Sequence, residues 1–79
     1  MICVKFYGLM RLESGIKELQ LEAESVKALF ARLEEAGFER KALRGCYLMV
    51  NGEKANTRTK LKDGDTLQLL PPVAGGYGG

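Results

Sequence analysis

The 79 residues predict one domain, close to the lower size limit for a chain that folds around a single apolar core. The chain is 46% apolar and 28% charged, which is typical of a soluble globular protein, and no apolar run approaches the ~20 residues of a membrane span. The net charge of +2 is spread evenly along the sequence and favours neither a nucleic-acid nor a membrane partner. The first residues alternate in polarity, unlike a signal peptide, so we expect a cytoplasmic location.

Composition also limits the chemistry. The chain has no histidine, which is the commonest general base and a common metal ligand. Cys3 and Cys46 lie too far apart for a metal-ligand motif and fit half-buried strand positions. We therefore expect a carrier or partner subunit, with no bound cofactor and no metal, and not an independent enzyme.

The first part of the chain predicts two strands. Residues 1–7 alternate, with Ile2, Val4 and Phe6 on one face. Residues 9–15 are expected to form a connection that ends in a Ser-Gly turn, and residues 16–21 form the second strand.

A helix is the clearest element of the sequence. Ser25 can cap its first turn, because a serine hydroxyl accepts a hydrogen bond from an amide that has no partner within the helix. The apolar residues that follow lie at helical spacing and form one stripe: Val26, Leu29, Phe30 and Leu33. The helix is expected to end near Ala36, with Gly37 in the left-handed position after it.

The second half predicts three more strands. Residues 38–45 form a connection, with Phe38 and Leu43 under the core, and residues 46–50 form a strand. Asn51-Gly52 is a strong hairpin signal before a short strand at 53–55.

A turn at residues 62–65 precedes the last strand, residues 66–70, which ends at a diproline because proline cannot donate to a strand ladder. The predicted fold is therefore α+β, with one amphipathic helix packed across a mixed sheet of about five strands. Residues 1–72 form the domain and residues 73–79 a flexible tail. The expected inward-facing residues are Ile2, Val4, Phe6, Leu19, Leu21, Val26, Leu29, Phe30, Leu33, Leu48, Val50, Leu67 and Leu69.

Four of the last five residues are glycine, and such a segment has almost no side chains to pack. It could be a frayed end without function. It could also thread a channel too narrow for larger residues, since it follows directly from a strand and a stiff diproline.

Three motifs in order, 50–53, 61–65 and 70–76, resemble the MoaD/ThiS family of sulfur carriers, which includes the small subunit of molybdopterin synthase. The opening segments 5–7 and 9–15 resemble the family too. The resemblance implies a ubiquitin-like β-grasp fold. It also implies that a ubiquitin-activating-like enzyme uses ATP to adenylate the terminal carboxylate, which a sulfur donor converts to a thiocarboxylate. The tail would then enter the molybdopterin synthase large subunit, or an equivalent acceptor, which takes the sulfur.

The chain departs from the family pattern by continuing past the diglycine at Gly76. Either a protease trims the tail and Gly76 carries the sulfur, or Gly79 does, and three extra residues would add about 10 Å of reach. The residues expected to thread the channel are Val73, Ala74, Gly75, Gly76, Tyr77, Gly78 and Gly79.

Strand alternation places several apolar residues on the sheet face opposite the helix. They are Cys3, Tyr7, Tyr47, Met49 and Leu70. We expect this face to bind the partner enzymes, although loops or a second copy of the chain could cover it instead.

Other functions stay open at this stage. The sulfur could serve thiamine or another metabolite, the chain could be a ubiquitin-like modifier joined to lysines, or it could be a β-grasp binding module without terminal chemistry. The absence of a basic patch in the sequence weighs against an RNA-binding module.

Overall fold

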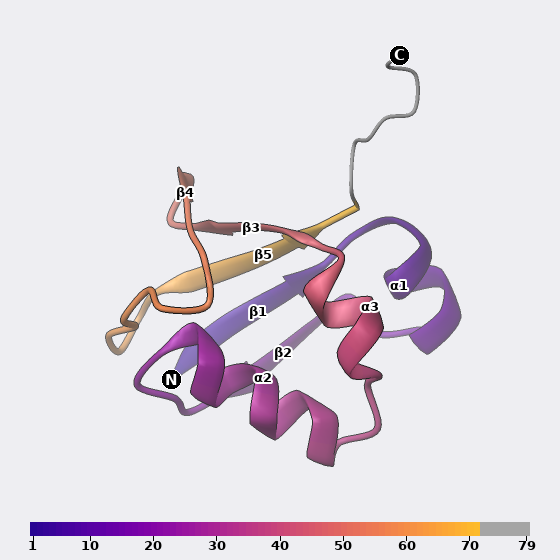
Figure 1. The fold of residues 1–79 in the computed structure, drawn as a ribbon, viewed down its shortest axis with the longest axis horizontal. Coiled ribbons are helices and arrows are strands. Elements are labelled where there is room, and N and C mark those ends of the chain that lie inside the picture. Colours follow the sequence, from indigo (N-terminus) through magenta and orange to yellow (C-terminus); the bar gives the residue numbers. More distant parts are fainter. Residues whose placement is uncertain (72–79) are drawn as a thin grey trace.

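The computed structural model describes residues 1–71 of the chain, and in this part the strands form one mixed five-stranded sheet (Figure 1). Its order is β2-β1-β5-β3-β4, with β1 and β5 parallel at the centre and every other pair antiparallel. The predicted mixed sheet is confirmed. The strands are β1 (Ile2–Phe6), β2 (Glu18–Leu21), β3 (Tyr47–Val50), β4 (Glu53–Lys54) and β5 (Thr66–Leu70).

The main helix, α2 (Val26–Glu35), forms as predicted. The Ser25 hydroxyl accepts a hydrogen bond from the amide of Ala28 at 3.1 Å, so the cap is made. Gly37 has a φ of 108°, the left-handed conformation that ends many helices. The predicted apolar stripe is fully or almost fully buried, and it holds α2 across one face of the sheet.

The core lies between α2 and the two central strands. Alternate residues of β1 and β5 are buried, as predicted, whereas Leu19, Leu21, Leu48 and Val50 are half-buried around them. Phe38 stacks on Phe6 with ring centroids 4.9 Å apart, which confirms its expected place under the core. Leu43 is also buried as expected, and Leu61 is a core residue that the pattern did not indicate.

Two short helices were wrongly predicted as connections. They are α1 (Gly8–Ser14) and α3 (Arg40–Arg44), at seven and five residues. Neither is long enough to show a helical stripe, and α3 has one buried residue while Leu12 of α1 is 79% exposed. None of the helices in residues 1–71 has the length and apolar composition needed to cross a bilayer.

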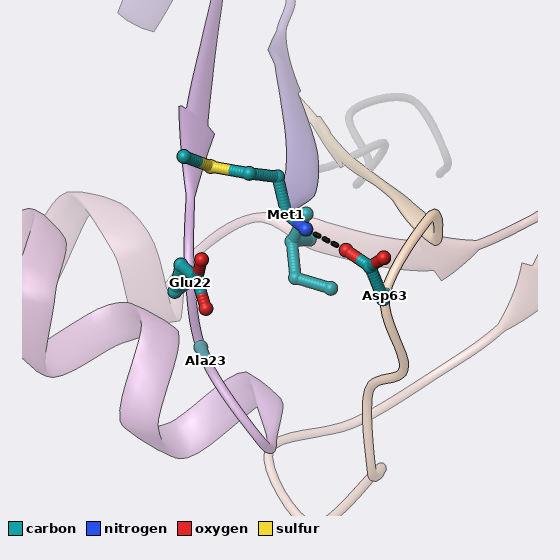
Figure 2. Close-up of a pocket in the computed structure, with 5 residues that line it drawn as sticks. Met1, Glu22, Ala23 and Asp63 are labelled. Carbon is teal, nitrogen blue, oxygen red and sulfur yellow. Dashed lines mark hydrogen bonds and ion pairs between the residues drawn. The ribbon is translucent and has the colours of Figure 1, made fainter.

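The N-terminus is tied to the turn before β5, far from the point where the tail begins. Figure 2 shows the amino group of Met1 paired with the carboxylate of Asp63 beside Glu22 and Ala23. The amide of Gly64 also donates to the Met1 carbonyl at 3.0 Å. Because β1 and β5 are parallel, both begin at this end of the sheet and both end at the opposite one (Figure 1).

Asp65 organises the same turn. Its carboxylate accepts hydrogen bonds from the amide of Lys62 at 2.8 Å and from the side chain of Asn51 at 2.9 Å. These bonds, the backbone amide of Lys62 foremost, lower the pKa of Asp65 below its ordinary value because they favour the ionised carboxylate.

Candidate functional site

The C-terminal tail begins at the end of a central strand. β5 is hydrogen-bonded to β1 on one side and to β3 on the other, so both edges of its backbone are held. Pro71 follows it and is exposed. The residues predicted to thread a partner's channel, including the alternative termini Gly76 and Gly79, lie outside the described residues, as does the boundary at residue 72. The structure therefore gives the root of the tail: a fixed strand end from which the last residues must start.

Gly8 and Pro71 are in close contact at this root. Gly8 has a φ of 67°, and a Cβ added to it would lie 3.0 Å from Cγ of Pro71 and 3.1 Å from its Cβ. Only glycine suits this position, for two reasons: its φ is positive, and the proline ring occupies the space that a side chain would need. The contact packs the start of α1 against the first residue after β5.

A hollow of about 260 Å³ opens beside the same proline, between α1 and α3. Tyr7, Met10, Ala42 and Cys46 line it with Pro71 and give it a mostly apolar surface. The charged side chains of Glu13 and Lys41 also line it. Such a hollow can receive an apolar side chain of a partner protein next to the start of the tail.

The sheet face opposite α2, which we call the open face, carries the residues predicted to bind partners. Tyr47 and Leu70 are neighbours on β3 and β5, and Met49 lies opposite Gln68, so the three share a face. Tyr7 follows β1 at the same end, where its hydroxyl accepts a hydrogen bond from the Gln68 side chain at 3.1 Å. We call the four residues Tyr7, Tyr47, Met49 and Leu70 the tail-end patch. Tyr47 is 48% exposed and the other three are half-buried, so the patch is accessible and lies where the tail starts.

Cys3 lies on the predicted face but not in the patch. It pairs with Gln20 on one side and Thr66 on the other, at the end of the sheet away from the tail. Its thiol lies 3.6 Å from the Glu18 carboxylate. Partial burial, then the nearby negative charge of Glu18, raises the pKa of Cys3. The apolar face is therefore smaller than the five residues suggested, and this thiol is a poor nucleophile.

Cys46 is equally inert. Its thiol donates to the carbonyl of Ala42 at 3.3 Å, and burial raises the pKa of the group. No cluster of three or more metal-ligating side chains occurs among residues 1–71.

Comparison with known proteins decides the family. A family model for ThiS matches residues 4–76. The chain belongs to the ThiS family. A search of curated protein sequences gives no significant match.

Solved structures agree with this ThiS-family assignment. The chain is 34% identical to a chain in the complex of subunits 1 and 2 of molybdopterin-converting factor from Helicobacter pylori, with a TM-score of 0.72 over 95% of this chain and 97% of that one. It is 27% identical to a chain in the BexX/CysO complex of Amycolatopsis orientalis, with a TM-score of 0.78 over 96% and 100%. The small archaeal modifier protein 1 of Methanosarcina acetivorans is 26% identical, with a TM-score of 0.76 over 95% of each chain.

The predicted membership of the MoaD/ThiS sulfur-carrier family and the ubiquitin-like β-grasp fold are therefore confirmed. Two of the three structures described above are of complexes with another protein. The Gly8 contact and the hollow were missed from the sequence. Gly8 itself was a signal, because a glycine directly after a strand often marks a close backbone approach.

Proposed function

We propose that this chain carries sulfur on its C-terminal glycine and delivers it for molybdopterin synthesis, in the molybdenum or tungsten cofactor pathway. The observation that carries the proposal is the placement of the tail root: a strand end fixed on both sides, next to an accessible apolar patch. The sequence identity of 34% to a molybdopterin-converting factor chain favours the pterin as acceptor over thiamine or another metabolite.

The chemistry belongs to partner enzymes, and this chain presents the reacting group. An adenylating enzyme joins the terminal carboxylate to AMP from ATP and releases pyrophosphate. A hydrosulfide equivalent then attacks the acyl carbon and AMP leaves, because a mixed anhydride has a good leaving group where a carboxylate has none. Because the tail starts from a fixed strand end, less freedom is lost when it enters an active site than if its root were mobile too.

The tail-end patch is proposed as the surface that binds the adenylating enzyme and then the acceptor subunit. Met49→Glu places a charge in the patch, two residues along β3 from Tyr47, and should abolish binding to the adenylating enzyme while the domain stays folded. Gln20→Glu is the matched control, because Gln20 lies on the same sheet face, beside Cys3, and is exposed. Equal binding by the two variants and the wild type, measured by titration calorimetry, would remove the patch from the proposal.

Intact-mass analysis tests the terminal chemistry. The full-length chain, a chain ending at Gly76 and a chain lacking residues 75–79 are each incubated with ATP, the adenylating enzyme and a sulfide source. We expect the chain ending at Gly76 to gain the mass of one oxygen exchanged for sulfur and the shortest chain to stay unchanged. If only the full-length chain gains sulfur, Gly79 is the working terminus and no trimming protease is needed. Sulfur on none of them refutes the carrier function.

A second candidate is a protein modifier joined through its terminal glycine to lysines. The sequence identity of 26% to small archaeal modifier protein 1 supports a modifier function. Both functions begin with adenylation, so the later product separates them. Isopeptide-linked adducts in cells would favour the modifier, and a thiocarboxylate without adducts would favour sulfur transfer.

A further inference from the structure

A groove of about 620 Å³ is lined by residues of α2, of α3 and of the 56–60 segment. The segment is fixed to the helix by its backbone. The amides of Val26 and Lys27 donate to the carbonyls of Thr59 at 2.9 Å and Thr57 at 3.1 Å. These bonds also satisfy amides of the first helical turn, which have no partner within the helix. The walls of the groove are therefore ordered backbone.

Positive charge gathers in this groove. Within residues 1–71, five cationic side chains and a single carboxylate line the groove, and that carboxylate, Glu34, is paired with Arg40 at 3.3 Å. The other four cations form no ion pair within residues 1–71. The local excess is larger than the net charge of +2 of the whole chain. The charges are therefore spread evenly along the sequence but unevenly over the surface of the folded chain. The five cations are Lys27, Arg40, Arg44, Arg58 and Lys60.

Part of the groove lining is apolar, and we call this part its floor. Phe30 and Ala31 line it from α2, and Ser25 and Thr57 add hydroxyl groups at one end. Phe30 is 6% exposed, so little of its side chain is accessible, whereas Ala31 is open to solvent. A cationic rim around an apolar floor complements a chain segment that alternates carboxylates with apolar side chains.

We propose that this basic groove binds an acidic, partly apolar segment of a partner protein. Carboxylates of the segment face the rim, and its apolar side chains cover Ala31 and the accessible part of Phe30. A small anion fits less well, because no charged or polar side chain among the described residues is buried, so no enclosed anion site exists. A nucleic acid fits less well, because the part of the chain that the structure describes places no exposed aromatic ring in the groove to stack on a base.

The groove and the tail-end patch lie on different sides of the molecule. α2 covers the inner face of the sheet, whereas the patch lies on the open face. A segment held by the groove therefore leaves the open face of the sheet uncovered. The proposal stands apart from the terminal sulfur chemistry and does not depend on it.

The test uses the full-length chain and a fluorescein-labelled peptide of repeated Glu-Glu-Leu triplets at physiological salt. Two double variants carry the same change in net charge. Lys27→Glu/Arg58→Glu alters the groove, and the control Arg11→Glu/Lys17→Glu alters exposed cations elsewhere. Fluorescence anisotropy should show binding weakened about tenfold or more by the groove variant and less than about twofold by the control. Circular dichroism checks that both variants fold.

Two comparisons complete the test. A peptide of Glu-Glu-Ser triplets has the same charge and should bind more weakly, because it cannot cover the apolar floor. Amide chemical-shift changes in the full-length chain should centre on Ala31 and Thr57. Equal weakening by both double variants, shift changes centred on the open sheet face, or tighter binding of a single-stranded oligonucleotide of matched charge would each overturn the proposal.

Discussion

Replacing Gly8 with alanine tests whether the close contact at the root of the tail matters. Two effects arise from the structure. An alanine at a φ of 67° costs about 1–2 kcal/mol of folding free energy, because an L side chain disfavours the left-handed region. Its Cβ would also lie 3.0 Å from Cγ of Pro71, so the proline must move by a few tenths of an ångström. Pro71 is exposed and can move, so the second effect should appear mainly in the direction of the tail.

Gly15→Ala is the matched control at the other end of α1. Gly15 has a φ of 73°, and no atom of residues 1–71 lies within 4 Å of an added Cβ, so only the backbone effect remains. Urea unfolding should therefore give similar losses of about 1–2 kcal/mol for the two variants. Under the proposed function, the rate of thiocarboxylate formation should fall about tenfold for Gly8→Ala, since small misplacements of a reacting group are costly, and should stay near wild type for Gly15→Ala.

Two measurements on both variants can refute the proposed role of the Gly8–Pro71 contact. Unfolding free energies come from circular dichroism at increasing urea, and initial rates come from intact-mass analysis at limiting concentration of the chain. If the two variants lose equal stability and also react at equal rates, the contact between Gly8 and Pro71 does not direct the tail. Because the unfolding measurement needs no partner enzyme, a failure of the proposed chemistry would leave the stability result standing.

Three further predictions concern the fold. Ser25→Ala removes the hydrogen bond to the Ala28 amide and should lower the free energy of unfolding by about 1 kcal/mol in urea titrations, whereas Ser25→Asp should retain most of it. Leu43→Ala leaves a cavity at a fully buried position and should cost about 2–5 kcal/mol by the same assay; a loss below 1 kcal/mol, on the order of a surface substitution, would contradict its place in the core. Asp65 has a lowered pKa in the folded state, so its stabilising effect is present above its ordinary pKa of about 3.9 and is lost as the pH falls through the folded value. Wild-type stability should thus fall on acidification below about pH 4, and Asp65→Asn should fall less over the same range.

Long periodic elements were predictable from the sequence because their physical signals are local. The stripe of α2, its Ser25 cap and Gly37 lie within one short stretch, and the hairpin after β3 depends on two adjacent residues. The helices α1 and α3 were not predictable on this basis, since five to seven residues give too few turns for a stripe to appear. Leu61 is buried in a loop that pairs with the segment before α2. Its amide donates to the carbonyl of Glu24 at 2.9 Å, a long-range pairing that no local pattern contains.

The candidate site was also predictable only in part. Alternation along a strand tells which face a residue lies on, and it placed Tyr47, Met49 and Leu70 correctly. It cannot tell where along the sheet a residue lies, because that depends on register between strands. Cys3 was therefore grouped with residues at the opposite end of the sheet. The basic groove is the larger omission, because its cations come from segments that are distant in sequence and meet only in the folded chain.

The parallel pairing of β1 and β5 has a practical outcome for experiments on this chain. A fluorophore, an affinity handle or an immobilising linker joined to Met1 would lie at the end of the sheet remote from Pro71 and would leave the root of the tail unobstructed. The modification would sacrifice the charge pairing between Met1 and Asp63, so the handle should be joined through a flexible extension that keeps a positive charge near that carboxylate.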